Sequence, residues 1–535
     1  MFKGYLSLIL NMHLPFVRHP ENDSMFEEKW LFEAISESYI PLIGVFGNLI
    51  NEKINFRLTI SMTPSLISML NDELLQKRYK RYLESMIELT EKEVIRTKYD
   101  IRLNELAKFY NRKYKEDYHK YVGVYKCDLI GTIKSFQESG TVEIIAGAAT
   151  HGFLPVYETC PKVIDAQVGI GVKTFLEYFQ KNPKGIWLPE CGYVPVIEKV
   201  LGRYGIKFIV IESHGLLYAN PRPVYSLYRP IVTPNGIVAF GRDTESAKEV
   251  WSAETGYPGD RDYRDFYRDI GYDLDFGYIK NYISRDGQRV NTGIKYHRIT
   301  GKTNEKKLYN PEGAVKKAGM HATDFMNRRI KQAEYIFDKI KKRPVMVCPF
   351  DAELFGHWWY EGPVWLDFLL RKLYFEQDTI RTATLSEYLE ENPVMQISNP
   401  NPSSWGCNGY SEYWLNGSND WIYRHLHKAS ERMTELADSH PGSSGITRKA
   451  LNQAARELLL AQSSDWAFIM KSGTMVQYAI KRTKEHLNNF TKIYNSIKEC
   501  NIDESWLNSL EQKNNIFPKI DYRIFSSFFN IGNIG

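Results

Sequence analysis

The chain has 535 residues, 43% hydrophobic and 25% charged, so it is long enough for more than one domain and lies outside the composition range of disordered proteins. Its net charge of +5 is spread over 69 basic and 64 acidic residues without a long like-charged block, which argues against a nucleic-acid partner. The six cysteines form no CxxC pair and no apolar run approaches about 18 residues, so we expect a cytoplasmic protein without disulfides, structural zinc or a membrane segment.

Seven short runs rich in apolar or β-branched residues recur between helical stretches and predict β-strands. In chain order they cover residues 5–10, 57–61, 142–147, 185–189, 208–212, 345–350 and 380–385. Strands that alternate with helices predict a parallel sheet, either closed into a barrel or doubly wound.

Three regions depart from this alternation. Residues 64 to about 121 carry apolar side chains three and four positions apart, which predicts a helical insertion after the second strand. Residues 242–293, rich in Tyr, Asp and Arg, predict loops over the mouth of a barrel. Beyond residue 401 strand signals end, and helices are expected at 420–437, 447–461 and 473–495, the first two joined by a turn-rich surface loop. These helices predict a C-terminal helical domain.

Carboxylates follow two of the predicted strands. In a parallel barrel, functional groups collect where strands end. Glu190 follows the fourth run within WLPECGY (187–193), and Asp351 and Glu353 follow the sixth within PFDAELFGHWWYEGP (349–363). Any one of them alone is an ordinary loop carboxylate. A pair beside aromatic clusters favours glycoside cleavage, in which one carboxylate attacks the anomeric carbon and the other protonates the leaving oxygen.

Two residues compete for the role of the acid. Asp351 is preferred because it directly follows the apolar run, and Glu353 is assigned an ion pair, although alternate residues of a strand share a face and alternation does not exclude it. To stay protonated near neutral pH, Asp351 needs a pKa raised by burial or by the charge of Glu190. Trp358 and Trp359 would supply apolar surroundings.

Several other side chains have two interpretations. The histidines at strand ends could be metal ligands, but no HExxH or other metal spacing is present, which favours contact with sugar: His13, His151, His214 and His357. Serine hydrolysis, nucleotide hydrolysis and dinucleotide binding lack their motifs. Trp405, Trp414 and Trp421 lie in a polar segment, and form either a glucan platform or a packing surface between domains.

The motifs resemble the five signature regions of glycoside hydrolase family 57. They are NMHLP, ATHGFLP, WLPECGY, PFDAELFGHWW and the segment with SSWG and WLNGSNDW, and together they span nearly the whole chain. The resemblance implies a distorted (β/α)7 barrel at 1–400 with a helical insertion at about 65–121, and a C-terminal helical domain at 401–535. It also implies a retaining mechanism through a covalent glucosyl-enzyme, with Glu190 as nucleophile and Asp351 as general acid/base.

The resemblance further implies a set of substrate contacts and a reaction. The substrate-binding residues would be His13, His151, Trp187, Cys191, Arg264, Gly293, His357, Trp405, Trp414, Asp465 and Gln477. Within the family the pattern most resembles branching enzymes and related α-amylases. We therefore expect an enzyme without metal or cofactor, a monomer or small homo-oligomer, that transfers α-1,4-glucan chains to 6-hydroxyls. An α-amylase or 4-α-glucanotransferase with the same carboxylates is the alternative, and a catalytically silent glycan-binding protein is a third hypothesis.

Two positions depart from the family pattern. Asn11 stands where the family has the first histidine of HxHxP, and because it can donate a hydrogen bond but carry no charge, we expect altered subsite affinity. Branching members shield the intermediate with a tyrosine on a flexible loop, whereas residues 241–250 contain no aromatic side chain. Tyr257 is the candidate substitute, and poor shielding would raise hydrolysis relative to transfer.

Overall fold

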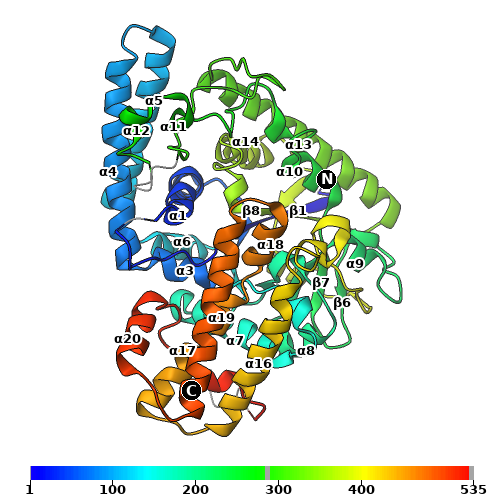
Figure 1. The fold of residues 1–535 in the computed structure, drawn as a ribbon. Coiled ribbons are helices and arrows are strands. Elements are labelled where there is room, and N and C mark those ends of the chain that lie inside the picture. The colour runs from blue at the N-terminus through cyan, green and yellow to red at the C-terminus, as the bar shows by residue number, and fades with distance from the viewer. Residues whose placement is uncertain (1, 24, 284–288, 529–535) are drawn as a thin grey trace.

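Seven parallel strands form the centre of the computed structural model, which describes residues 2–23, 25–283 and 289–528 (Figure 1). The strands are β1 (Gly4–Met12), β2 (Leu58–Met62), β3 (Val142–Gly147), β4 (Ile186–Trp187), β5 (Phe208–Ile211), β7 (Val238–Gly241) and β8 (Val345–Asp351). One ladder runs β4-β3-β2-β1-β8 and another joins β5 to β7. Single parallel bridges, Gly185 to Phe208 and Arg242 to Val347, close the ring. The predicted (β/α)7 barrel is confirmed.

The seventh ring strand is not one of the seven predicted runs. The run at 380–385 does form a strand, β9 (Ile380–Thr382), but it pairs only with Gly4–Leu6 at the start of β1 and lies off the ring. The next element along the chain is α15 (Leu385–Glu391). The ring is completed by β7, whose sequence VAFG has Ala and Gly, two residues depleted in strands, at two of its four positions.

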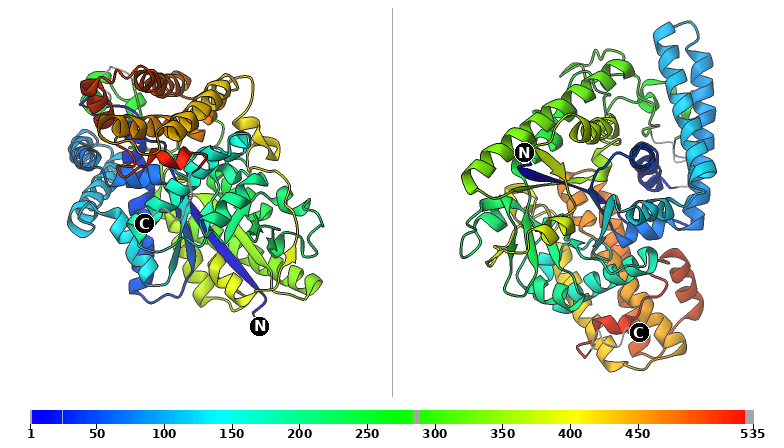
Figure 2. Two further views of the ribbon diagram at one scale, coloured as in Figure 1. Left: turned by 90° about the horizontal axis from the view of Figure 1, so that it is seen from below. Right: turned by 180° about the vertical axis from the view of Figure 1, so that it is seen from behind.

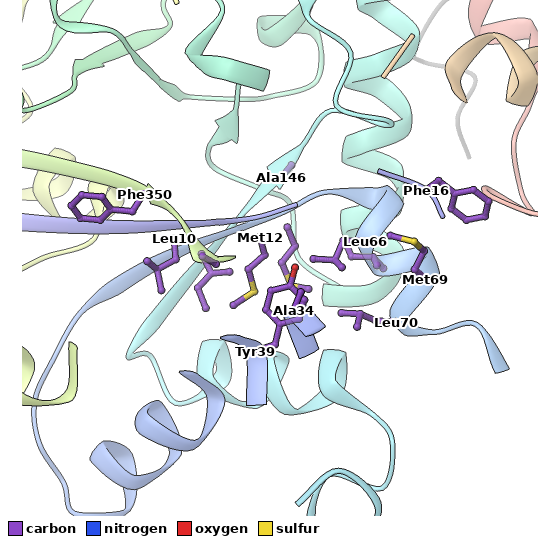
Figure 3. Packing of buried hydrophobic residues seen from close by; sticks show 14 of the residues in the cluster. Leu10, Met12, Phe16, Ala34, Tyr39, Leu66, Met69, Leu70, Ala146 and Phe350 are labelled. Carbon is purple, nitrogen blue, oxygen red and sulfur yellow. The ribbon is translucent and has the colours of Figure 1, made fainter. Parts of the chain in front are cut away.

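Strand alternation decides which side chains enter the barrel. Even-numbered residues of β1, including Leu10 and Met12, belong to the outer core. Figure 3 shows Leu10 beside Phe350, and Met12 near Tyr39 of η1 (Ile35–Tyr39). Odd-numbered residues such as Tyr5 and Ile9 belong to the interior cluster with Trp187 and Val347. The same parity places Asn11 and Asp351 on the interior side.

The predicted helical insertion is a long hairpin that projects from the barrel (Figures 1 and 2). It consists of α4 (Glu73–Arg96) and α5 (Ile101–Tyr118), whose first turns are capped by Asp72 and Asp100. Apolar residues at helical spacing on α4 are buried, among them Leu75, Tyr79 and Met86. The predicted insertion is therefore a pair of helices that buries one apolar face and projects from one side of the barrel.

The segment at 242–293 contains more regular structure than predicted. It begins with α10 (Thr244–Trp251), the helix that follows β7. It continues with the short helices α11 (Ile270–Asp273) and α12 (Phe276–Ile279). Residues 284–288 of this predicted loop region lie outside the described residues. The nearby long helix α13 (Pro311–Ile340) packs against β1 and α14 (Gly362–Phe375).

The C-terminal part is helical, as predicted. The expected helices correspond to α16 (Trp421–Ser439), α17 (Gly445–Ala461) and α19 (Val476–Lys498), while α18 (Ser464–Ser472) and α20 (Glu504–Lys513) were not predicted. These helices lie along one side of the barrel, and α18 reaches its mouth near β8 (Figures 1 and 2).

Within the described residues, every helix is too short or too polar to cross a membrane.

Candidate active site

A cavity of about 550 Å³ lies between the carboxyl ends of the barrel strands and α18. Seven predicted site residues line it: His13, His151, Glu190, Asp351, Trp405, Trp414 and Asp465. The wall also contains Asn11, Arg242, Trp251, Glu353, Trp358, Tyr413 and Phe468. It therefore combines carboxyl groups with the aromatic faces on which sugar rings stack.

Asp351 is the last residue of β8 and the register partner of Asn11 on β1. The side-chain amide of Asn11 donates a 3.0 Å hydrogen bond to Asp351 Oδ1. Burial raises the pKa of Asp351, whereas this hydrogen bond and the charge of His13 lower it. Asn11 thus contacts the carboxyl group itself, a role that the prediction of altered sugar affinity did not include.

Glu190 lies in the tight turn Pro189–Cys191 that follows β4, with a left-handed backbone (φ 62°) that residues other than glycine rarely adopt. Trp405 holds this turn twice, because its backbone N–H donates to the Glu190 carbonyl at 3.0 Å and its Nε1 donates to Oε2 at 2.8 Å. The hydroxyl of Ser464, at the start of α18, lies 3.0 Å from Oε1. Both oxygens of Glu190 are therefore fixed by hydrogen bonds.

Glu190 and Asp351 form a pair with shared electrostatics. Burial raises the pKa of Glu190 to about 7; the hydrogen bond from Trp405 opposes this rise, and the charge of Asp351 adds to it. Because burial also raises the pKa of Asp351, the pair can hold one proton near neutral pH. One carboxylate can then attack while the other carboxylic acid donates a proton.

Glu353 lies beside this pair but is held differently from the prediction. Its Oε1 accepts hydrogen bonds from the Tyr39 hydroxyl and from the backbone N–H of His13, the latter at 3.2 Å. The predicted ion pair is not formed, since no basic side chain of the described residues lies within ion-pair distance of Glu353. Burial and the charge of Asp351 raise its pKa to about 8, so on pKa alone it remains a competitor for the acid role.

Two histidines stack at the cavity wall, with ring centroids 3.8 Å apart. His13 Nε2 lies 3.0 Å from Asp465 Oδ2, and the attraction of Asp465 outweighs burial and raises the pKa of His13. Burial and the neighbouring charge of His13 depress the pKa of His151 well below its ordinary value. Despite burial, the charge of His13 lowers the pKa of Asp465 to about 2. His13 is therefore the more readily protonated ring of the stack, and His151 the ring that stays neutral.

Two predicted substrate contacts lie behind the cavity wall. Trp187 and Cys191 are buried in the barrel interior and are not among the lining residues. The ring of Trp187 packs against Trp405 with centroids 5.1 Å apart. They support the side chain that holds Glu190, and their contact with sugar stays a prediction.

The tryptophans of residues 403–421 have different roles. Trp405 and Trp414 both line the cavity. Trp414 is only 1% exposed and stacks on Phe153 with ring centroids 4.5 Å apart, so it joins this segment to the barrel and is not an exposed platform. Trp421 is half-buried at the start of α16. Gln477 is exposed on the first turn of α19 and lies outside the cavity wall.

Three other predicted residues meet around Glu37, on the π-helix η1. Arg264 Nη2 lies 3.0 Å from Glu37 Oε1, and His357 Nδ1 lies 2.7 Å from Oε2. Gly293 has a φ of +85°, and a Cβ there would lie 2.7 Å from the Tyr114 hydroxyl, so only glycine fits. Although burial opposes it, the charge of Arg264 holds the pKa of Glu37 well below its ordinary value. Glu37 was missed because no motif marks it.

Tyr257 lies away from the cavity wall. Its hydroxyl donates to Asp324 Oδ2 at 2.8 Å and its ring packs on His321. The aromatic residue of α10 that lines the cavity is Trp251, the last residue of the helix. Its ring centroid lies 5.8 Å from that of Trp405. It immediately follows the aromatic-free segment 241–250, which is the signal that could have pointed to it.

Among the described residues, no group of three or more His, Cys, Asp or Glu side chains is arranged to hold a metal ion. A seven-stranded parallel barrel that presents two partly buried carboxyl groups in an aromatic-walled cavity is the arrangement of a glycoside-cleaving enzyme.

Comparison with known proteins agrees with this class. The model of glycosyl hydrolase family 57 matches residues 7–317, and the model described as 1,4-alpha-glucan branching enzyme, C-terminal, matches residues 425–525. The chain therefore belongs to glycosyl hydrolase family 57.

Named relatives include both branching enzymes and an amylase. The chain is 33% identical to a 1,4-alpha-glucan branching enzyme of Thermococcus kodakarensis, over 97% of this chain and 78% of that protein. It is similar to the solved structure of the α-amylase AmyC from Thermotoga maritima, with 43% identity, a TM-score of 0.92 and coverage of 98% of this chain and 99% of that chain. It is also similar to a GH57-type branching enzyme from Pyrococcus horikoshii, with 33% identity, a TM-score of 0.88 and coverage of 99% and 98%.

Proposed function

We propose that the protein is a retaining 1,4-α-glucan branching enzyme. It cleaves an α-1,4 bond of an amylose-like chain, holds the released segment on Glu190 and transfers it to a glucan 6-hydroxyl. The C-terminal match to branching enzymes and the branching enzymes among its relatives support the reaction. The hydrogen bonds at the two carboxyl groups support the roles of the residues.

The observation that carries this assignment is the different number of hydrogen bonds at the pair. Glu190 accepts side-chain hydrogen bonds on both oxygens, from Trp405 and Ser464, and such donors favour a carboxylate anion. Asp351 accepts only one from the described side chains, on Oδ1 from Asn11, so Oδ2 is open to carry a proton. Glu190 is therefore the better nucleophile and Asp351 the better acid.

The reaction proceeds in two steps, formation of the covalent glucosyl-enzyme and transfer of its glucan chain to the acceptor. In the first, Glu190 attacks the anomeric carbon, the bond to the glycosidic oxygen breaks, and Asp351 gives its proton to the leaving 4-oxygen. In the second, Asp351 takes the proton from an acceptor 6-hydroxyl, whose oxygen attacks the same carbon and releases Glu190. Two inversions at one carbon retain the α configuration.

Hydrolysis is the second candidate function, because an α-amylase shares 43% identity with this chain. In that case water replaces the 6-hydroxyl in the second step. A 4-α-glucanotransferase would use a 4-hydroxyl. All three reactions use the same covalent intermediate, so they differ only in the acceptor.

Product analysis of amylose distinguishes these acceptors. After incubation we expect new α-1,6 anomeric signals by proton NMR, and short chains released by an isoamylase-type debranching enzyme. The Asp351→Asn protein serves as the control for contaminating activity. Growth of reducing ends without α-1,6 signals would indicate an amylase, and disproportionation of malto-oligosaccharides without branches a glucanotransferase.

A second prediction concerns Asn11. Replacing it by Leu removes the donor to Asp351 and should lower kcat by about 10-fold, the usual scale of a hydrogen bond to a charged group. Because this bond favours the charged form, its loss raises the pKa of Asp351 and moves the basic limb of the pH profile to higher pH. The exposed Asn71→Leu variant is the control, and an unchanged basic limb in Asn11→Leu would contradict the role.

We also propose that residues 1–400 form the catalytic domain, with the insertion at about 65–121, and that residues 401–535 form the C-terminal domain. The helices beyond residue 421 and the hairpin α4–α5 support this division. We further propose a cytoplasmic location and a monomer or small homo-oligomer. The six cysteines, all free thiols in the structure, support a reducing compartment.

A further inference from the structure

The first residues of α18 are attached to the barrel through its backbone. The N–H of Ser464 donates to the carbonyl of His151 at 3.0 Å, and Ser463 forms an antiparallel bridge with Gly152. These contacts pin the start of the helix to the loop that follows β3. These contacts hold the start of α18 against the cavity wall, although it lies more than 300 positions after His151 in the chain.

The hydroxyl of Ser464 joins two groups of the site. It lies 3.0 Å from Glu190 Oε1 and 2.9 Å from His151 Nδ1, and the residue is only 2% exposed. A carboxylate can only accept, so the hydroxyl donates to Glu190 and accepts from the N–H at Nδ1 of His151. This order fixes the neutral tautomer of His151, which agrees with its depressed pKa.

Among the described residues, no other side chain donates a hydrogen bond to Glu190 Oε1. Trp405 holds the other oxygen, and His151 Nδ1 lies 3.7 Å from Oε1, beyond good hydrogen-bond distance. Without the hydroxyl, the carboxyl group would be held at one oxygen only and could rotate about its last bond.

We propose that Ser464 is a positioning residue, through which the C-terminal helices orient the Glu190 carboxylate and keep it ionised for attack. The proposal rests on the proposed function, in which Glu190 is the nucleophile. Because burial raises the pKa of Glu190 to about 7, loss of a donor to its charged form moves ionisation further above neutral pH. The charged or titratable groups that surround Glu190 come from five other parts of the fold: His13, His151, Arg242, Asp351 and Asp465.

The test compares Ser464→Thr with Ser464→Val, two side chains of nearly the same shape that differ by the hydroxyl. In the Val variant, and in Ser464→Ala, we expect kcat on amylose to fall by about 10- to 100-fold, the scale of a charge-assisted hydrogen bond. The acid limb of the kcat/KM profile should move upward by about 1 pH unit, because the nucleophile must be ionised. KM should change little, and Ser464→Thr should keep the acid limb of the parent protein.

Ser472→Ala, at the exposed end of the same helix, is the control and should behave as the parent. Equal kcat and equal acid limbs in the Thr and Val variants would overturn the proposal, even if the Ala variant is unstable. Failure of the proposed function would look different, since the unmodified protein would then form no α-1,6 linkages from amylose, whatever the Ser464 variants do.

Discussion

Glu190→Gln should lower kcat on amylose by on the order of 10⁴-fold, the loss typical of removing a nucleophile. The amide has the size of the carboxylate and still accepts a hydrogen bond from Trp405 or Ser464, so the turn at Pro189–Cys191 should keep its shape. It cannot form the covalent glucosyl intermediate. Initial rates of amylose consumption, measured beside the melting temperature of each variant, check this result.

A substrate with a good leaving group separates the nucleophile from the acid. With an α-maltosyl fluoride, which needs no proton to leave, Asp351→Asn should still form a covalent adduct on Glu190 that mass spectrometry detects. Glu190→Gln should form none. Glu353→Gln is the matched control for the competing acid, since Glu353 lies next to the pair with its own raised pKa. If Glu353→Gln alone spares the fluoride and loses amylose activity, the acid assignment is wrong.

Arg329→Met should lower the free energy of unfolding by about 3–5 kcal/mol, the cost of leaving a buried charge unpaired. Arg329 on α13 is fully buried. Its Nη1 lies 3.0 Å from Asp243 Oδ1 and its Nη2 lies 3.0 Å from Glu249 Oε1. Asp243 is itself 2% exposed and caps α10 by accepting from the N–H of Ser246. Met fills much of the space but supplies no charge, so Asp243 loses its cation. Urea unfolding at constant pH measures the difference.

The neighbouring arginine provides the control. Arg328 is 56% exposed and pairs with Asp324 across the surface, so Arg328→Met should change stability by less than about 1 kcal/mol. If the two substitutions lower the free energy of unfolding equally, burial of the Arg329 ion pair does not determine how much it contributes to stability.

Much of the barrel could be predicted from the sequence because its strands are short, apolar and separated by helices. Asp351 was chosen because it directly follows an apolar run, and in the structure it shares the inward face of β8 with Val345 and Val347. Two features escaped. β7 has Ala and Gly at two of its four positions and so lacks a strong strand signal, and β9 has the composition of a ring strand but pairs only with the first residues of β1. Pairing partners are set by tertiary structure, which local patterns do not contain.

The candidate site was predictable where residues directly follow strands, and less so where they arrive from elsewhere. Glu190, Asp351, His13 and His151 are strand-end residues, and all line one cavity. Ser464 follows no strand, and only the packing of α18 against the barrel brings its hydroxyl to Glu190. Glu37 likewise carries no motif of its own. The burial of Trp414 could not be read from its polar neighbours.

The position of α18 also limits how this protein can be recombined with its relatives. A crossover at residue 401 would join this barrel to foreign side chains in place of Trp405, Ser464 and Asp465, which hold Glu190 and His13. The smallest exchangeable unit is therefore the barrel together with the linker and α18. Chimaeras that respect the cavity wall should inherit intact chemistry, whereas those cut at the apparent domain boundary should fold as two bodies with a mismatched nucleophile pocket.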